Sequence, residues 1–162
     1  MQQLTREQIL ASFRGATRSE IDRVSFPLDF NDLDFSRLEF LGWRDRKIPR
    51  RAYVVTEFDG VPVALVLTRA ERTPLRRTMC AWCRDLELDD DVVLYVARRA
   101  GERGRRGNTI GAMVCQDFAC NAHVRKLPPA FHGGTDLEAI RRTQIDGLKH
   151  RVDSFVSEAL NP

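Results

Sequence analysis

The chain has 162 residues, of which 43% are hydrophobic and 30% charged, and it carries a formal net charge of +3. This composition is ordinary for a globular protein, and the length allows one domain, or a core with a small attached lobe. No apolar run approaches the roughly 18 residues of a membrane-spanning helix, and the first residues lack a secretory signal. We therefore expect a cytoplasmic protein without a membrane partner, and the small net charge decides nothing about nucleic acid.

The first quarter of the chain predicts short helices. Residues 5–8 fit a capping box, in which the first and last side chains each bond a backbone amide. The apolar face of the helix that follows is formed by Ile9, Leu10 and Phe13. Ser19 is a candidate cap for a second short turn, which Pro27 ends. The segment 28–43 is rich in Phe, Leu and Asp, and predicts a short helix or a turn whose aromatic side chains fill the core.

Asp59 and Gly60 lie between two stretches of strand-forming residues, 52–58 and 61–68. A type I′ turn needs a positive φ at both central positions, and the pair Asp-Gly tolerates this conformation. The sequence therefore predicts a β-hairpin here.

Two further strands are predicted at 91–97 and 109–115, where β-branched and other apolar residues dominate. The linker between them, RRAGERGRRGN, is too polar to be buried, so we expect an exposed loop. A short helix is predicted from Cys120 onward, and a pair of prolines ends it. A capping box at 135–138 then begins a long helix with one apolar stripe. That stripe is formed by Leu137, Ile140, Leu148, Val152, Phe155 and Val156.

The four cysteines form two pairs, Cys80 with Cys83 and Cys115 with Cys120, with two intervening residues in the first pair and four in the second. In a reducing compartment, paired cysteines favour a metal over a disulfide. A Zn²⁺ ion takes four thiolates tetrahedrally, so we predict one structural zinc ion held by all four cysteines. Buried free thiols and a redox pair are the alternatives, although a redox pair needs a βαβ setting and leaves the second cysteine pair unexplained.

A cysteine turn, a hairpin and a second cysteine pair that leads into a helix follow one another in the order of a treble-clef zinc finger. A lobe this small buries too little apolar area to fold alone, so a bound metal contributes folding free energy directly. The predicted fold class is α+β, with antiparallel β-hairpins, a treble-clef finger and a long C-terminal helix. We assign residues 1–70 to a helical segment and hairpin packed on the finger, and residues 71–162 to the finger with its helix, and expect one compact unit.

An enzyme is not expected. Four cysteine ligands leave no open zinc position for water, and no serine or histidine stands in a nucleophilic setting. The glycines of 101–111 match neither a phosphate loop nor a dinucleotide fingerprint, so no small-molecule substrate is expected. His123, three residues after Cys120, can replace a cysteine as ligand, but a position on the helix surface or beside the ligands is the favoured interpretation.

Several segments resemble one protein family. MCAWC, VVLYVARRAG, ERGRRGNTIGAMVC and QDFACNAHVRK, within 79–126, are similar to the C-terminal zinc finger of the elongation-factor-G-binding family, which includes the fusidic-acid-resistance proteins. FLGWRD and the hairpin after it resemble the short actinobacterial relatives, so the likeness covers residues 5–160. The resemblance implies a treble-clef protein without catalytic activity, whose better-known relatives release elongation factor G trapped on the ribosome by the antibiotic. The implied zinc ligands are Cys80, Cys83, Cys115 and Cys120.

Basic residues are concentrated between Arg98 and Lys126, where seven arginines and lysines outnumber two acidic residues. The glycine-rich stretch 101–108 can grip phosphates or an acidic protein surface, and an ordinary solvated turn is the alternative. Trp82 and Phe118 supply apolar anchors if they are exposed, and pack the lobe if they are buried. The predicted partner-binding residues are Trp82, Arg103, Arg105, Arg106, Asn108, Phe118, Arg125 and Lys126.

The leading interpretation is a protein that docks on the translation machinery, with elongation factor G or the nearby ribosome as its partner. Structured RNA is the alternative partner, and it predicts binding that weakens steeply with salt, because cations on phosphates release counterions. Tyr95 is the only tyrosine of the finger, so few aromatic residues are available to stack on bases.

Overall fold

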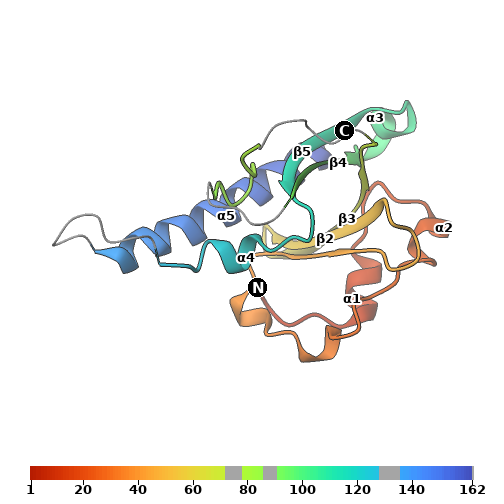
Figure 1. The fold of residues 1–162 in the computed structure, drawn as a ribbon. Coiled ribbons are helices and arrows are strands. Elements are labelled where there is room, and N and C mark those ends of the chain that lie inside the picture. The colour runs from red at the N-terminus through yellow and green to blue at the C-terminus, as the bar shows by residue number, and fades with distance from the viewer. Residues whose placement is uncertain (72–77, 86–90, 128–135, 162) are drawn as a thin grey trace.

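The structure, a computed structural model, describes residues 1–71, 78–85, 91–127 and 136–161. A five-stranded antiparallel sheet forms its centre, and each strand pairs with the next one in the chain (Figure 1). The strands are β1 (Leu41–Arg44), β2 (Arg51–Phe58), β3 (Val61–Arg69), β4 (Val92–Arg98) and β5 (Thr109–Cys115). Helices lie on both faces of this sheet. The predicted α+β class is therefore confirmed.

The turn between β2 and β3 has the predicted geometry. Asp59 and Gly60 adopt φ values of 50° and 74°, as a type I′ turn requires. The eight residues of β2 pair with β3 from Arg51 to Phe58. The hairpin prediction is confirmed.

The sheet separates two hydrophobic cores, and β2 contributes to both because successive side chains point to opposite faces. One core, here called the N-terminal core, is formed by Leu4, Ile9, Phe13, Phe30, Phe35, Leu41, Trp43, Tyr53, Val55 and Ala64. The other, here called the finger core, surrounds the four cysteines and includes Phe40, Ala52, Val54, Leu65, Leu67, Trp82, Val93, Tyr95, Val114, Phe118 and residues of the C-terminal helix.

Four short helices cover the face of the N-terminal core. They are α1 (Arg6–Ala11), α2 (Arg18–Ile21) and the 3₁₀ helices η1 (Phe30–Asp32) and η2 (Phe35–Arg37). Thr5 caps α1 in the predicted capping box, since its hydroxyl accepts from the Gln8 amide and the Gln8 side chain accepts from the Thr5 amide.

Two expectations for this layer need correction. Thr17, not Ser19, caps α2, because its hydroxyl accepts from the Glu20 amide while Ser19 lies inside the helix. Residues 28–43 form the short helices η1 and η2, whose Phe30 and Phe35 fill the core as expected, but the segment ends in the start of strand β1, which was not expected. Buried and half-buried residues alternate along β1, which is the pattern of a strand with one face on a core, and its buried Leu41 and Trp43 both belong to the N-terminal core.

The finger core lies between the sheet and helix α5 (Leu137–Leu160). From α5 it receives Leu148, Val152, Phe155 and Val156 of the predicted apolar stripe. Ile140, in contrast, is 37% exposed. The cap of α5 is Asp136, whose carboxylate accepts from the Ala139 amide at 2.9 Å, whereas the predicted cap, Thr135, lies outside the described residues. No helix in the described ranges is both long and apolar enough to cross a membrane.

The linker between β4 and β5 is not the loop that its composition predicts. It folds into the short helix α3 (Gly101–Arg105), most of whose residues are exposed. Gly104 is buried, and a Cβ there would lie 1.7 Å from the Arg99 carbonyl oxygen, so glycine allows the helix to pack on the strand end. The predicted helix at Cys120 is present as α4 (Cys120–His123), shorter than its sequence suggests.

Residues at and just before β1 also contact the segment that follows β5. Asn121 of α4 accepts a hydrogen bond from the Glu39 amide and donates one to the Phe40 carbonyl, both at 2.8 Å. Arg44 of β1 forms an ion pair at 2.9 Å with Asp117, which follows β5. The N-terminal and C-terminal halves of the chain therefore share one sheet and meet again at its edges.

Candidate metal centre

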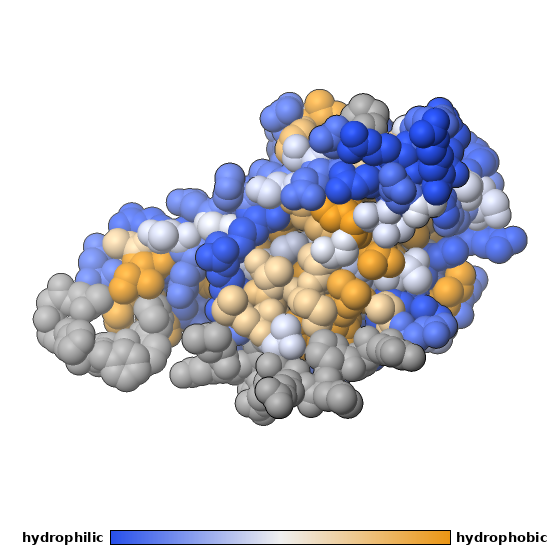
Figure 2. Space-filling view, turned by 90° about the horizontal axis from the view of Figure 1, so that it is seen from above, coloured by the Kyte–Doolittle hydropathy of each residue, from blue (hydrophilic) through white to orange (hydrophobic). Residues whose placement is uncertain are grey.

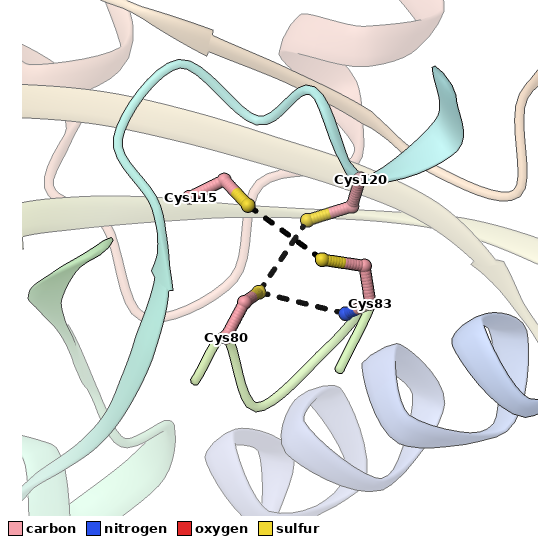
Figure 3. Close-up of side chains that lie close together, drawn as sticks. All are labelled: Cys80, Cys83, Cys115 and Cys120. Carbon is pink, nitrogen blue, oxygen red and sulfur yellow. Dashed lines mark hydrogen bonds between the residues drawn. The ribbon is translucent and has the colours of Figure 1, made fainter. Parts of the chain in front are cut away.

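Three separate elements bring the four cysteines together. The pair at 80–83 lies in a turn, Cys115 ends β5, and Cys120 begins α4. The Ala81 amide donates to the Met113 carbonyl at 2.7 Å and holds the turn against β5. All four side chains point toward one another (Figure 3).

The sulfur atoms have the spacing of ligands around one ion. They lie within 4.8 Å of one another, and all four residues are buried. The Sγ atoms of Cys80 and Cys120 are 3.7 Å apart, and those of Cys83 and Cys115 are 3.6 Å apart. A disulfide has its sulfurs about 2.05 Å apart, whereas Zn–S bonds of about 2.3 Å at tetrahedral angles place them about 3.8 Å apart. The cluster therefore fits a tetrahedral zinc ion.

The thiols strongly influence one another's ionisation. Hydrogen bonds from Cys115, Cys120 and Cys83 lower the pKa of Cys80, and those from Cys115 and Cys120 lower the pKa of Cys83 to about 7. Hydrogen bonding with Cys115 and the other two thiols raises the pKa of Cys120. Neighbouring thiolates repel one another, so all four ionise together only beside a compensating cation. A divalent metal supplies this charge, since it binds the deprotonated sulfur.

The cysteine turn is held by backbone geometry and by an arginine of α5. The Cys83 amide donates to Cys80 Sγ at 3.5 Å, and Arg84 leaves the turn with a φ of 57°. Nε of Arg151 donates to the Trp82 carbonyl, which places a cation near thiolates that carry net negative charge. The sequence did not reveal Arg151 as a site residue, because its partner lies 69 positions away.

His123 lies at the margin of the cysteine cluster. Its Nδ1 is 3.7 Å from Sγ of Cys83 and 3.6 Å from Sγ of Cys115. The imidazole thus occupies a position beside the four sulfurs, as the favoured interpretation of the sequence expected.

Trp82 and Phe118 are 2% and 4% exposed, so they belong to the core of the finger and offer no surface anchor. The Trp82 ring meets Phe40 and Phe155 edge-on, with centroid distances of 5.0 and 5.6 Å. Phe118 stacks on Tyr95 at 5.1 Å. Of the two interpretations of these aromatic residues, packing of the lobe is the one that their burial supports.

The polar residues predicted around the linker are exposed on or beside α3. They are Arg103, Arg105, Arg106 and Asn108. Arg105 and Arg106 both pair with Glu102, at 2.8 and 3.1 Å. Because these ion pairs are exposed, they contribute little to stability and leave the guanidinium groups accessible to another molecule.

Arg125 and Lys126 differ in their surroundings. Arg125 is partly buried and bonds the Glu39 carboxylate at 2.7 Å and the Asn121 carbonyl at 3.0 Å. It therefore ties the segment before β1 to α4. Lys126 is exposed beside it and is the one of the two that is free to face a partner.

Comparison with known proteins agrees with this centre. Residues 8–159 match the family described as FBP C-terminal treble-clef zinc-finger. The chain belongs to this family. The solved structure of the fusidic acid resistance protein FusC has a similar fold, with a TM-score of 0.62 and 15% identity, over 98% of this chain and 59% of that chain. This FBP-type chain thus spans about three fifths of the length of FusC. No curated protein matches its sequence closely enough to count as a relative.

The FBP zinc-finger match and the four buried cysteines both fit a structural zinc ion, which confirms the predicted cofactor. Four thiolates complete a tetrahedral coordination shell and leave no position for water or substrate. A metal held this way ties the cysteine turn, β5 and α4 together, so its role is in folding.

Proposed function

We propose that this protein is a non-enzymatic, cytoplasmic zinc protein that docks on the translation machinery, with elongation factor G or the adjoining ribosomal surface as its partner. The FBP family match and the FusC-like fold support a protein of the fusidic-acid-resistance type. The observation that carries the docking proposal is the exposed basic helix α3, which lies in the hairpin that ends at Cys115.

Helix α3 presents its cations on a fixed support. The Ala100 amide, just before the helix, donates to the Ala159 carbonyl at 2.7 Å, and Arg99 bonds the Glu158 carbonyl. The C-terminus of α5 thereby holds the base of α3. A preorganised arginine cluster loses less conformational entropy on binding than one carried on a free loop, so it is suited to a specific acidic surface.

Apolar side chains accompany these cations on the same hairpin. Leu94 and Val96 alternate with the buried Val93 and Tyr95, so they point to the outer face of β4 and are half-buried. Met79, before the cysteine turn, is 47% exposed. Figure 2 shows hydrophobic residues in the middle of one face with hydrophilic residues at its margin. A protein partner with an apolar centre and an acidic rim matches this arrangement.

The test is a calorimetric titration of elongation factor G with the zinc-loaded protein and with the triple variant Arg103→Ala/Arg105→Ala/Arg106→Ala. We expect the triple variant to bind at least about tenfold more weakly and to show a weaker salt dependence, because it lacks the cations that steer association. Its matched control is Arg37→Ala/Arg46→Ala/Arg142→Ala, which removes the same charge from exposed positions on other elements. Absence of binding at tens of micromolar would refute the partner while leaving the zinc site standing.

Structured RNA remains the second candidate, favoured by the same arginines. It predicts that the α3 triple variant weakens binding to unrelated RNAs equally and lowers the salt slope. Against it, Tyr95 is 1% exposed and stacked on Phe118, so it cannot stack on a base. Titration of a structured ribosomal RNA fragment at two salt concentrations separates the two partners.

A further inference from the structure

His123 is a potential metal ligand next to a centre already supplied with four thiols. Its Nδ1 lies 3.7 and 3.6 Å from the sulfurs of Cys83 and Cys115. A Zn–N bond of about 2.1 Å and a Zn–S bond of about 2.3 Å, at tetrahedral angles, separate nitrogen from sulfur by about 3.6 Å. The distance from Nδ1 to the Cys83 sulfur is therefore close to that between two ligands of one zinc ion, and the contact with Cys115 places the ring beside the sulfur that it would replace.

The position of His123 on α4 supplies a second argument. Cys120 is the first residue of α4 and His123 is its last, and residues three apart lie on the same face of a helix. The spacing from Cys120 to His123 equals that from Cys80 to Cys83. One helical turn can thus present a thiolate and an imidazole together, as the cysteine turn presents two thiolates.

We propose that His123 is a reserve zinc ligand. With all four cysteines bound, its Nδ1–H donates to the thiolates of Cys83 and Cys115. When Cys115 is replaced by a residue without a thiol, Nδ1 would take the vacant coordination position. Cys115 is the thiol concerned because its loss leaves the 80–83 half-site whole and lets Cys120 and His123 form the second half-site.

The step balances without another reactant, because a chain that lacks the Cys115 thiol has no thiolate to release. The ring would carry its proton on Nε2 and present the Nδ1 lone pair to zinc. Replacing one thiolate with a neutral ring removes one negative charge from the site. Imidazole and thiolate are both ordinary ligands of structural zinc, so tetrahedral geometry is kept.

The experiment compares Cys115→Ala with Cys115→Ala/His123→Ala in the full chain. We expect the single variant to retain one metal ion per chain through gel filtration. With Co²⁺ in place of zinc, its ligand-field absorption bands should shift to shorter wavelength, because an imidazole has replaced a thiolate. The double variant should bind the metal about 10- to 100-fold more weakly than the single variant, as measured in competition with a chelator.

Cys80→Ala is the matched control, because Cys80 is also fully buried and its sulfur contacts Cys120 and the Cys83 amide. We expect this variant to lose its metal whether or not His123 is present. Equal metal loss in Cys115→Ala and in the double variant would overturn the proposal. A Cys115→Ala protein that fails to fold in zinc-containing medium would overturn it too, since a reserve ligand must hold the fold.

A measurement on the wild-type zinc-loaded protein tests whether Nδ1 of His123 donates a hydrogen bond to the thiolates. The ¹⁵N chemical shifts of the histidine ring report which nitrogen carries the proton. We expect His123 to be protonated on Nδ1, the atom that faces the thiolates of Cys83 and Cys115. A ring protonated only on Nε2 would contradict the proposal, because a bare Nδ1 lone pair beside two thiolates is repelled by them.

Discussion

The N-terminal core and the finger core lie back to back on one sheet, yet different forces close them. The N-terminal core is closed by apolar and aromatic side chains such as Phe30, Phe35 and Trp43, whose burial stabilises it without any cofactor. The finger core is closed around four thiols that cannot ionise together without a cation. One small domain thus combines a core stabilised by aromatic packing with a core stabilised by a metal ion. Strand β2 joins the two, because it is buried on both of its faces.

Removing zinc should have the largest effect, and it should act on the two cores unequally. Structural zinc contributes about 10–16 kcal/mol of apparent binding free energy in isolated fingers. Trp82 lies in the finger core and Trp43 in the N-terminal core, so the variants Trp43→Phe and Trp82→Phe each leave a single fluorescent reporter. After chelation, we expect the emission of Trp82 to shift to the red more than that of Trp43. Equal shifts would show that the two cores unfold as one unit.

Gly42→Ala should break the contact between the sheet and the finger. A Cβ at this position would lie 2.6 Å from the Phe118 ring, and overpacking of this kind costs about 1–3 kcal/mol. Urea denaturation of the zinc-loaded variant measures the loss. In the control Gly111→Ala, the new Cβ meets Leu94 and Val96 at 3.1 Å and the Tyr95 carbonyl at 3.3 Å, which are wider separations, so the cost should be smaller. A Gly42→Ala protein as stable as the wild type would refute the close fit.

Asp45→Asn should test a buried carboxylate beside the otherwise apolar N-terminal core. Burial raises the pKa of Asp45, but hydrogen bonds from Tyr53 and from the amides of Lys47 and Ile48 outweigh this effect and hold that pKa below its ordinary value. A lowered folded-state pKa contributes stability that is present above the unfolded pKa of about 3.9 and is lost as pH falls through the folded value. We expect the variant to lose about 1–2 kcal/mol at pH 7.

The pH dependence of unfolding provides the check on Asp45. Below pH 4 the difference in unfolding free energy between the wild type and Asp45→Asn should shrink, because the wild-type carboxylate becomes protonated there. A difference that stays constant from pH 7 to pH 3 would show that the Asp45 charge does not stabilise the fold.

Thr17→Ala should have the smallest effect of the four and should differ from Ser19→Ala. The Thr17 hydroxyl accepts from the Glu20 amide at 3.2 Å, and loss of such a cap costs about 1 kcal/mol. Ser19 is a residue of α2 whose side chain is exposed, so its replacement should change the free energy of unfolding by less than about 0.5 kcal/mol. Thermal unfolding of the two variants side by side decides between the two caps.

Local sequence signals predicted most of the fold. The Asp59–Gly60 turn, the strands near 91–97 and 109–115, and the spacing of the four cysteines each follow from the conformations or ligand geometry that those residues favour. The errors occurred where two local signals compete. Thr17 and Ser19 are both good caps, and the hydrogen bond that the Thr17 amide donates to the Glu20 carboxylate selects Thr17.

Contacts between distant segments could not be predicted from one sequence. A stretch of glycine and arginine is compatible with a loop or a short helix, and α3 forms because Gly104 packs on the Arg99 backbone and Ala100 bonds α5. Asn121 and Arg151 matter through partners just before β1 and in the cysteine turn. Neither residue has a local pattern that marks it, so only the tertiary fold reveals its role.

Backbone pairing at both margins of the sheet restricts how another chain can bind. The Asn121 side chain bonds the amide and carbonyl just before β1, which is four residues long. On the opposite margin, the Met113 carbonyl of β5 already accepts from Ala81. At these positions an added strand finds the backbone groups already paired, which discourages strand addition and aggregation there. Such an arrangement favours recognition through side chains, and the exposed arginines and apolar residues of the hairpin are the ones that it leaves accessible.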